Sequence, residues 1–199
     1  LVLCDLDTLG TLPSREFRAG LAEEITYGII YDAKLFRRLE RDLPKLLAQD
    51  TATLSAVIAR CCQIKAEVVG QDEKEAGLRA ILNFGHTIGH GLEAISQYGK
   101  YLHGEAISIG QAVAAKISNE WTGLPDAEVD RIATIFAAAG LPTEVSLNAT
   151  QTKRLFAAMK LDKKVSGGEI KFVLAESIGR VKIGQSVPDA AVRRALRKS

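Results

Sequence analysis

Hydrophobic residues recur along most of this chain at the three- to four-residue spacing that is typical of amphipathic helices. The clearest case is residues 51–70, where one helical side carries six apolar residues: Leu54, Val57, Ile58, Cys61, Ile64 and Val68. Pro44 interrupts another such stretch, and we expect it to break the helix or to join two helices. The spacing as a whole predicts helices over residues 14–30, 33–48, 51–70, 104–120 and 126–139.

The period changes near the C-terminus. Residues 169–175 and 180–184 alternate between apolar and polar side chains on either side of Ser177-Ile-Gly179, which predicts a β-hairpin. A short helix with a basic end is expected over residues 188–198. The predicted fold class is therefore mainly α, a multi-helix domain with one small hairpin.

The first residues follow a third pattern. Leu1-Val-Leu-Cys4 is an apolar run typical of a buried strand, and residues 8–13 have the composition of a turn. A lone strand leaves its edges unpaired, so we expect residues 1–13 to continue the sheet of an N-terminal domain that this sequence lacks. Residues 14–199 would then form the helical domain, with an orphan strand before it.

Composition narrows the class of protein. With 199 residues, 47% of them hydrophobic and 25% charged, the chain suits a globular protein with one well-buried core. A net charge of +2 is too small to indicate nucleic acid or an anionic membrane as the partner. No apolar run approaches the roughly 18 residues of a membrane helix. Three cysteines without CxxC spacing, and a start without a basic leader, favour a reduced cytoplasmic protein.

All three histidines, His86, His90 and His103, fall within eighteen residues of one another. Histidine is the commonest metal ligand, and on a helix His86 and His90 would share one face. A catalytic zinc usually has three protein ligands and one open position, so two histidines would need a carboxylate partner. Four glutamates are candidates that the spacing does not separate: Glu23, Glu24, Glu93 and Glu105. The pattern predicts a metal centre with a proton-transfer group beside it.

A purely structural interpretation of the same segment stays open. An isolated HxxxH pair is often a pair of partly buried histidines that hydrogen-bond to carbonyl groups. Gly85, Gly89 and Gly91, which we expect in the same helix, allow close approach either of a neighbouring helix or of a ligand. The third histidine nearby is what favours the metal.

Positive residues surround the predicted centre. Arg79 lies seven residues before His86, so we expect two helical turns to place it on the same face. Lys65 lies on the preceding helix, and Lys163 and Lys164 lie in the segment before the hairpin. Such groups suit a phosphate or carboxylate ligand. The sequence has no GxGxxG and no Walker loop, so this chain by itself is not expected to bind a dinucleotide.

Several runs together resemble 3-dehydroquinate synthase, in order and over essentially the whole chain. They are Asp7-Thr-Leu-Gly-Thr-Leu-Pro13, Ala19-Gly-Leu-Ala-Glu23, Lys65-Ala-Glu-Val-Val-Gly-Gln-Asp-Glu73, Gly77-Leu-Arg79, Asn83-Phe-Gly-His86-Thr-Ile-Gly-His90, Leu102-His-Gly-Glu-Ala106 and Asp162-Lys-Lys164. The match corresponds to the C-terminal, mostly helical domain of that family. The family's N-terminal NAD-binding domain is absent from the sequence.

The resemblance implies a role for each of several residues. A divalent metal, zinc or cobalt, would be held by Glu23, His86 and His103. Substrate binding and catalysis would fall on Lys65, Arg79, Asn83, His90 and Lys163. NAD would be touched by Thr8, Leu9, Gly10 and Thr11 from this side of the interdomain cleft. The family converts the sugar-acid phosphate DAHP to 3-dehydroquinate with loss of phosphate, in the shikimate pathway. The complete enzyme is expected to be a homodimer. This chain alone is expected to be inactive.

The sequence departs from the family at one position of the predicted site. The family usually has a lysine three residues after the metal glutamate, whereas here Ala22-Glu23-Glu24-Ile25-Thr26 places a threonine there. Threonine cannot supply a cation to the substrate. Two alternatives therefore stay open: a related sugar-phosphate cyclase or metal-dependent alcohol dehydrogenase, and a non-catalytic metal-binding domain.

Overall fold

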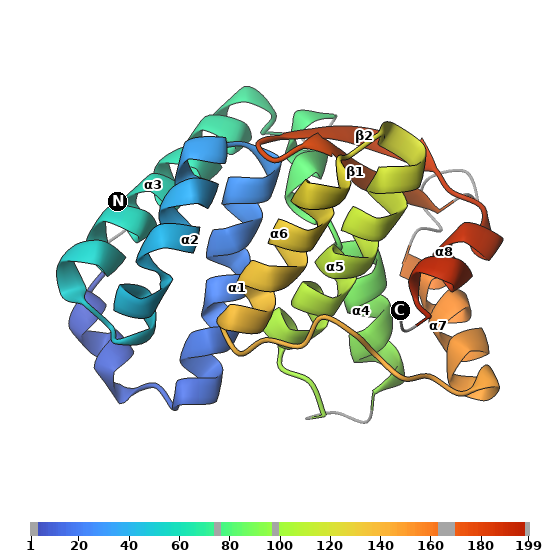
Figure 1. Cartoon of the computed structure of the whole chain (residues 1–199), viewed down its shortest axis with the longest axis horizontal. Coiled ribbons are helices and arrows are strands. Elements are labelled where there is room, and N and C mark those ends of the chain that lie inside the picture. Colours follow the sequence, from blue (N-terminus) through green and yellow to red (C-terminus); the bar gives the residue numbers. More distant parts are fainter. Residues whose placement is uncertain (1–3, 74–76, 97–99, 163–169, 198–199) are drawn as a thin grey trace.

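Eight α-helices and one β-hairpin make up residues 4–73, 77–96, 100–162 and 170–197, which the computed structural model describes (Figure 1). The helices are α1 (Ser14–Ile30), α2 (Ala33–Leu47), α3 (Thr51–Gln71), α4 (His86–Ile95), α5 (His103–Thr122), α6 (Asp126–Ala138), α7 (Ala149–Asp162) and α8 (Asp189–Ala195). Two 3₁₀ helices, η1 (Leu6–Thr11) and η2 (Leu78–Asn83), precede α1 and α4. Strands β1 (Lys171–Ser177) and β2 (Arg180–Ser186) pair antiparallel. No helix in these ranges is both long enough and apolar enough to span a membrane.

The five helices predicted from apolar spacing are confirmed to within two residues at each end. The expected break at Pro44 is wrong, because α2 continues through it to Leu47. Pro44 lies in the last turn, where the helix loses one backbone hydrogen bond, and the buried side chains of Leu39, Leu43 and Leu46 keep that turn on the core.

The predicted hairpin and terminal helix are also confirmed, with different bounds at their ends. Helix α7 was not predicted, and Leu161 and Asp162 belong to it rather than to a loop. Its start does carry a sequence signal: Asn148 and Gln151 cap each other's backbone N–H groups, at 2.8 and 2.9 Å. The strand expected at the N-terminus falls mostly on residues 1–3, which lie outside the described residues, and Cys4 has no regular secondary structure.

Two hydrophobic clusters divide the domain. The first gathers apolar side chains of α1, α2, α3 and α6, and the second those of α4, α7 and α8, while α5 and β1 contribute side chains to both. Figure 1 shows α2 and α3 beside the N-terminus, α1, α6 and α5 in the middle, and α7 and α8 beside the C-terminus. Helix α5 packs against both α1 and α4, so it joins the two clusters.

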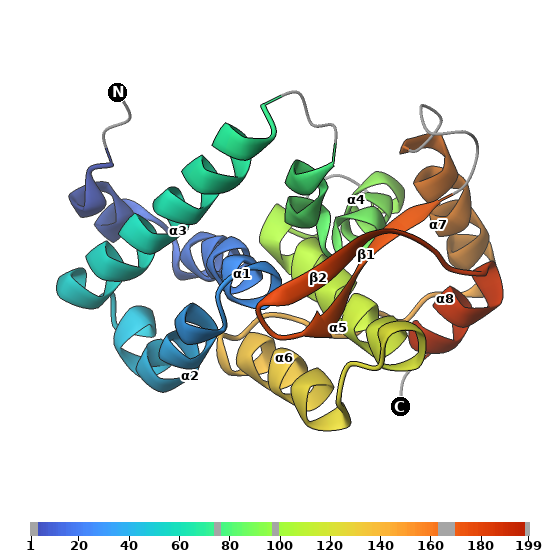
Figure 2. The ribbon, with the colours of Figure 1, turned by 90° about the horizontal axis from the view of Figure 1, so that it is seen from above.

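The hairpin lies across the ends of the central helices, as Figure 2 shows from above. Strand β1 packs on α5 and β2 packs on α1. Backbone N–H groups fix it there: that of Ala175 donates to Ser118 Oγ of α5 at 2.8 Å, and that of Gly179 to the Ile29 carbonyl of α1 at 2.7 Å. The hairpin therefore holds α1 and α5 in a fixed relation.

Glycines bring α1, α4 and α5 into near backbone contact. A Cβ atom at Gly104 would overlap the carbonyl of Ala19 in α1, and one at Gly110 would overlap the carbonyl of Gly85. At Gly89 a Cβ would lie 2.6 Å from Ile107 Cδ1. Gly85 is not inside the helix as expected: it is the N-cap of α4, with φ 76°, a conformation that favours glycine. Helix packing, not ligand approach, explains these glycines.

Candidate metal centre

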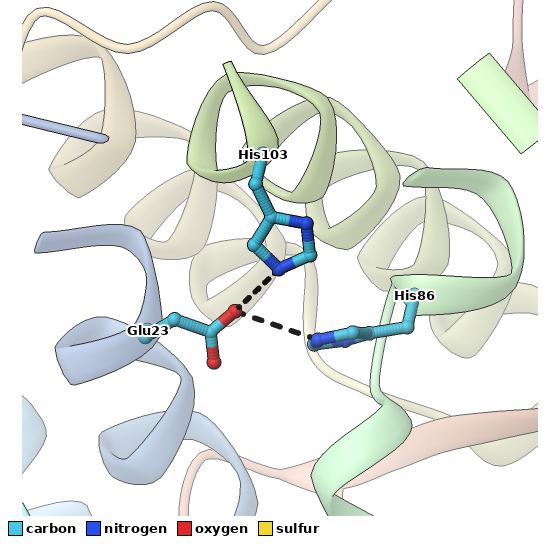
Figure 3. Close-up of side chains that lie close together, drawn as sticks. All are labelled: Glu23, His86 and His103. Atoms are coloured by element: carbon cyan, nitrogen blue, oxygen red, sulfur yellow. Dashed lines mark ion pairs between the residues drawn. The ribbon is translucent and has the colours of Figure 1, made fainter. Parts of the chain in front are cut away.

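Three side chains from three helices meet where α1, α4 and α5 approach one another (Figure 3). Glu23 projects from α1, His86 is the first residue of α4, and His103 is the first residue of α5. Glu23 Oε1 lies 3.4 Å from His86 Nε2 and 3.3 Å from His103 Nε2. The structure thus brings together the three residues that the resemblance implied as ligands.

The spacing of these atoms suits a tetrahedral metal ion. Ligand atoms about 2.0–2.1 Å from zinc in a tetrahedron lie roughly 3.3–3.4 Å apart. Both measured separations match that value. Within the described residues, Glu23 Oε1 is buried and has no hydrogen-bond partner. The residues present therefore fit a divalent metal with nitrogen and oxygen ligands.

Both imidazole rings are oriented by a partner on Nδ1. His86 Nδ1 lies 3.1 Å from the carbonyl oxygen of Phe84, and His103 Nδ1 lies 3.0 Å from Glu93 Oε1. Both partners are acceptors, so each Nδ1 carries a proton and donates. Each Nε2 is then the nitrogen that can bind a metal once it carries no proton, and both Nε2 atoms face Glu23.

The charges at the centre reinforce one another. Burial would by itself raise the pKa of Glu23, but the neighbouring imidazoles of His103 and His86 outweigh it and lower the pKa to about 2. The Glu23 carboxylate raises the pKa of His103 to about 9, although burial opposes the rise and Glu93 adds to it. A carboxylate that stays ionised far below neutral pH is a ready metal ligand.

The other three candidate carboxylates are engaged elsewhere. Glu93 binds His103 from the side away from Glu23. Glu105 takes two hydrogen bonds from Arg15, both 2.7 Å, and caps the backbone of Leu102. Glu24 is turned into the protein, where burial raises its pKa to about 7. The sequence left the choice open because it depends on how α1 is turned against α4 and α5.

His90 lies beside the three ligand candidates. Its ring centre is 5.4 Å from that of His86 and 6.0 Å from that of His103. The shared helical face predicted for His86 and His90 is borne out by α4. The imidazole stands close enough to act on a molecule bound at the centre.

Three of the other residues predicted to act on the substrate lie on elements that precede α4. Lys65 is exposed on α3, and Arg79 and Asn83 lie at the two ends of η2. The prediction that Arg79 shares a helical face with His86 is wrong, because η2 ends at Asn83 and the positive φ of Gly85 separates it from α4. Lys163 lies outside the described residues.

Residues 8–11 form most of η1, which packs against α3. The hydroxyl of Thr8 donates to the carbonyl of Asp5 at 2.6 Å, and that of Thr11 to the carbonyl of Thr8 at 2.8 Å. The expected turn is therefore a 3₁₀ helix closed by its own side chains.

Thr26 occupies the position of the family lysine, and it is buried. Its hydroxyl donates to the Ala22 carbonyl at 2.9 Å and accepts from Gln111 Nε2 of α5. Gln111 Oε1 is buried without a partner in the part of the chain that the structure describes. Sequence reasoning missed Gln111, since no local pattern links it to a residue 85 positions away.

Two solved structures with this architecture are synthases. The valiolone synthase ValA from Streptomyces hygroscopicus, bound to NAD⁺ and Zn²⁺, has a TM-score of 0.87 and 27% identity, covering 96% of this chain and 53% of that one. A 2-deoxy-scyllo-inosose synthase with carbaglucose-6-phosphate, NAD⁺ and Co²⁺ has a TM-score of 0.77 and 25% identity, over 97% of this chain and 55% of that one. The fold and the three-helix centre thus define the class, dehydroquinate synthase-like synthases.

Sequence comparison gives the family. Residues 20–165 match the family model for the C-terminal domain of 3-dehydroquinate synthase. The chain is 49% identical over 188 residues to the 3-dehydroquinate synthase of Nitrosomonas europaea, covering 94% of this chain and 50% of the relative. It is 46% identical over 196 residues to that of Gloeobacter violaceus, covering 98% and 54%. The chain belongs to the 3-dehydroquinate synthase family, and it spans about half the length of the curated relatives it matches.

Proposed function

We propose that this chain is the metal- and substrate-binding half of a 3-dehydroquinate synthase, which converts DAHP to 3-dehydroquinate with elimination of phosphate. The observation that carries the proposal is the Glu23–His86–His103 group at tetrahedral spacing, in a chain of this family. Relatives of that name, and synthases described with NAD⁺ and Zn²⁺ or Co²⁺, support it. The enzyme would be a carbon–oxygen lyase of aromatic amino acid biosynthesis.

In this proposal Glu23, His86 and His103 hold a divalent metal, zinc or cobalt. The bound metal would supply Lewis-acid polarisation of a substrate oxygen. The Phe84 carbonyl accepts from His86 Nδ1 and so keeps the Nε2 of that imidazole facing the metal position. The low pKa of Glu23 keeps its carboxylate ionised and able to bind at neutral pH.

The remaining site residues act on the substrate. Lys65, Arg79 and Lys163 would offset the negative charge of its carboxylate and phosphate groups. Asn83, just before α4, would orient hydroxyl groups by hydrogen bonds. His90 would take up or release a proton at an imidazole nitrogen, a role that histidine side chains commonly have in catalysis. Its place beside His86 and His103 supports this role.

The other half of the enzyme would bring NAD. The curated relatives are about twice as long as this chain, and we place NAD between their additional domain and η1, with Thr8, Leu9, Gly10 and Thr11 on this side. Residues 1–13 would connect the two domains, and the complete enzyme would be a homodimer. The unpaired Cys4, Cys61 and Cys62 support a cytoplasmic location.

Metal content tests the first part of the proposal. The chain is loaded with zinc and dialysed exhaustively, and the retained metal is measured by elemental analysis. We expect one equivalent in the wild type and none in His86→Ala, with the helical circular dichroism of both unchanged. His90→Ala is the matched control, the same change one turn further along α4, and it should keep the metal. Full metal retention by His86→Ala would refute the ligand set.

Joining the chain to the N-terminal half of its Nitrosomonas europaea relative tests the reaction. We expect NAD-dependent release of phosphate from DAHP together with formation of 3-dehydroquinate. One observation favours a second candidate, a non-catalytic metal-binding domain: Thr26 stands where the family has lysine, and Gln111 closes over it. Metal retention without phosphate release in the joined protein would favour that candidate.

A further inference from the structure

His103 is the ligand candidate with the weakest support from its own segment. It is the first residue of α5, and its side chain is 50% exposed, whereas that of His86 is 12% exposed. His86 is held by a backbone carbonyl two residues before it. For His103 the Nδ1 partner is a side chain on another helix, Glu93 of α4.

The two carboxylates beside His103 have opposite effects on its neutral imidazole. Glu23 lies 3.3 Å from Nε2 and would favour a proton there, which blocks that nitrogen as a metal ligand. Glu93 lies 3.0 Å from Nδ1 and favours the proton on that side. The Nδ1–H form is the one that leaves Nε2 free to bind a metal where Figure 3 shows Glu23 and His86 converging.

The position of Glu93 follows from how α4 is packed. Glu93 lies seven residues after His86, so two helical turns put both residues on the same face. The close approach of α4 to α5 at Gly89 brings that face against the start of α5. Helix α4 therefore carries one ligand candidate and also the support of another.

We propose that Glu93 is a positioning residue for the metal centre, which fixes His103 as the Nδ1–H form and so makes its Nε2 available as a ligand. The inference rests on the proposed metal centre and adds a residue that the family resemblance did not assign. A histidine ligand that donates its other N–H to a carboxylate is a recurrent arrangement in metal sites. A competing arrangement has to be tested against it, since His90, Glu93 and His103 also bring ligand atoms within 4.8 Å of one another.

The test compares zinc affinities by competition with a chromophoric chelator. Removing such a carboxylate typically weakens metal binding about 10–100-fold, and we expect this for Glu93→Ala. Glu93→Gln keeps a carbonyl oxygen that accepts from Nδ1–H, so its loss should be smaller. Glu120→Ala is the matched control, because Glu120 lies near the other end of α5 in an exposed pair with Arg194. It should bind zinc like the wild type.

Nitrogen-15 chemical shifts of the imidazoles in the zinc-loaded proteins provide a second readout that a general loss of stability would not change. We expect zinc on Nε2 and a proton on Nδ1 of His103 in the wild type, and altered His103 shifts in Glu93→Ala, with those of His86 unchanged. If Glu93→Ala matches Glu120→Ala in both affinity and shifts, the positioning role is refuted and the metal centre stands.

Stoichiometry separates the remaining outcomes. A wild type that binds two equivalents, with the second lost in both Glu93→Gln and His90→Ala, would mean that Glu93 is itself a ligand and would overturn the positioning role. A wild type that binds no zinc would refute the metal centre, and the role of Glu93 would fall with it. One equivalent, weakened in the order alanine more than glutamine, supports the proposal.

Discussion

The two walls of the metal centre are built differently. The α4–α5 wall supplies His86, His103 and Glu93, the contact of His103, from two helices in near backbone contact. The α1 wall supplies Glu23 alone, from a helix that belongs largely to the other hydrophobic cluster. A metal at this centre would bind both walls, so metal binding and packing of the two clusters should be coupled.

The difference also appears in how polar groups are satisfied. On the α4–α5 wall His86 and His103 each have a partner for Nδ1. On the α1 wall two buried carboxylate oxygens, Glu23 Oε1 and Glu24 Oε2, have no hydrogen-bond partner among the described residues, whereas α5 has one such atom, Gln111 Oε1. The α4–α5 wall is therefore expected to be preformed, and the α1 wall to be the less stable half of the site.

The largest expected effect comes from adding or removing the metal that would join the walls. At free zinc about 1,000 times the Kd, binding should raise the free energy of unfolding by about 4 kcal/mol. His86→Ala should remove that gain while leaving the unfolding of the metal-free protein nearly unchanged. Urea unfolding with zinc and with a chelator measures both. An equal gain in the variant would show that zinc acts elsewhere on the chain.

Disrupting the α4–α5 contact should lower the free energy of unfolding by nearly as much as zinc binding raises it. Gly110→Ala places a methyl group against the Gly85 carbonyl, a backbone atom that cannot turn away. We expect a loss of about 3 kcal/mol in the free energy of unfolding, together with weaker zinc binding. Gly20→Ala is the control, since a Cβ there meets nothing within 4 Å, and it should gain up to about 1 kcal/mol. A Gly110→Ala protein as stable as the wild type would mean that the two helices can separate freely.

The pH dependence of stability sharpens the contrast on the α1 side. Burial raises the pKa of Glu24 to about 7 from an ordinary value of 4.5. A carboxyl group with a raised folded pKa destabilises the protein as pH rises from about 4.5 to about 7, by at most about 3 kcal/mol. Glu24→Gln cannot ionise, so its stability relative to the wild type should grow over that window and then level. If the difference in free energy of unfolding between Glu24→Gln and the wild type stays the same from pH 4.5 to pH 8, the Glu24 carboxyl group does not have the raised pKa expected from its burial.

Apolar spacing was enough to predict most of the helices and the hairpin, because an amphipathic helix records its buried face in its own sequence. Helix α7 escaped, although the reciprocal cap at Asn148 and Gln151 was visible in the sequence. Arg79 was misplaced because the left-handed backbone at Gly85 ends a helical register that spacing alone extends. Apolar spacing therefore predicts helices and strands, but it fails where a single residue changes the direction of the backbone.

The site was predictable in part for the same reason. The cluster of three histidines indicated a metal from local spacing, and α4 does put His86 and His90 on one face. The choice of Glu23 over the other glutamates came from family resemblance, since it depends on the rotation of α1 against helices more than sixty residues away. The contacts of Glu93 with His103 and of Gln111 with Thr26 also depend on how the helices pack against one another, so the periodicity of the sequence does not reveal them.

The smallest expected effect concerns the hydrogen bond from Gln111 of α5 to the Thr26 hydroxyl of α1. A lysine at position 26 would enter space that Gln111 fills, so Thr26→Lys alone should lower the free energy of unfolding by about 1–3 kcal/mol. Gln111→Ala removes the obstruction but leaves the Thr26 hydroxyl without its donor. Because the two residues touch, the double variant should lose less than the sum of the single losses, by about 1 kcal/mol. If the losses of the two single variants in urea unfolding simply add up in the double variant, the lysine side chain can turn out of the buried position without displacing Gln111. Packing alone would then join α1 and α5 at this point.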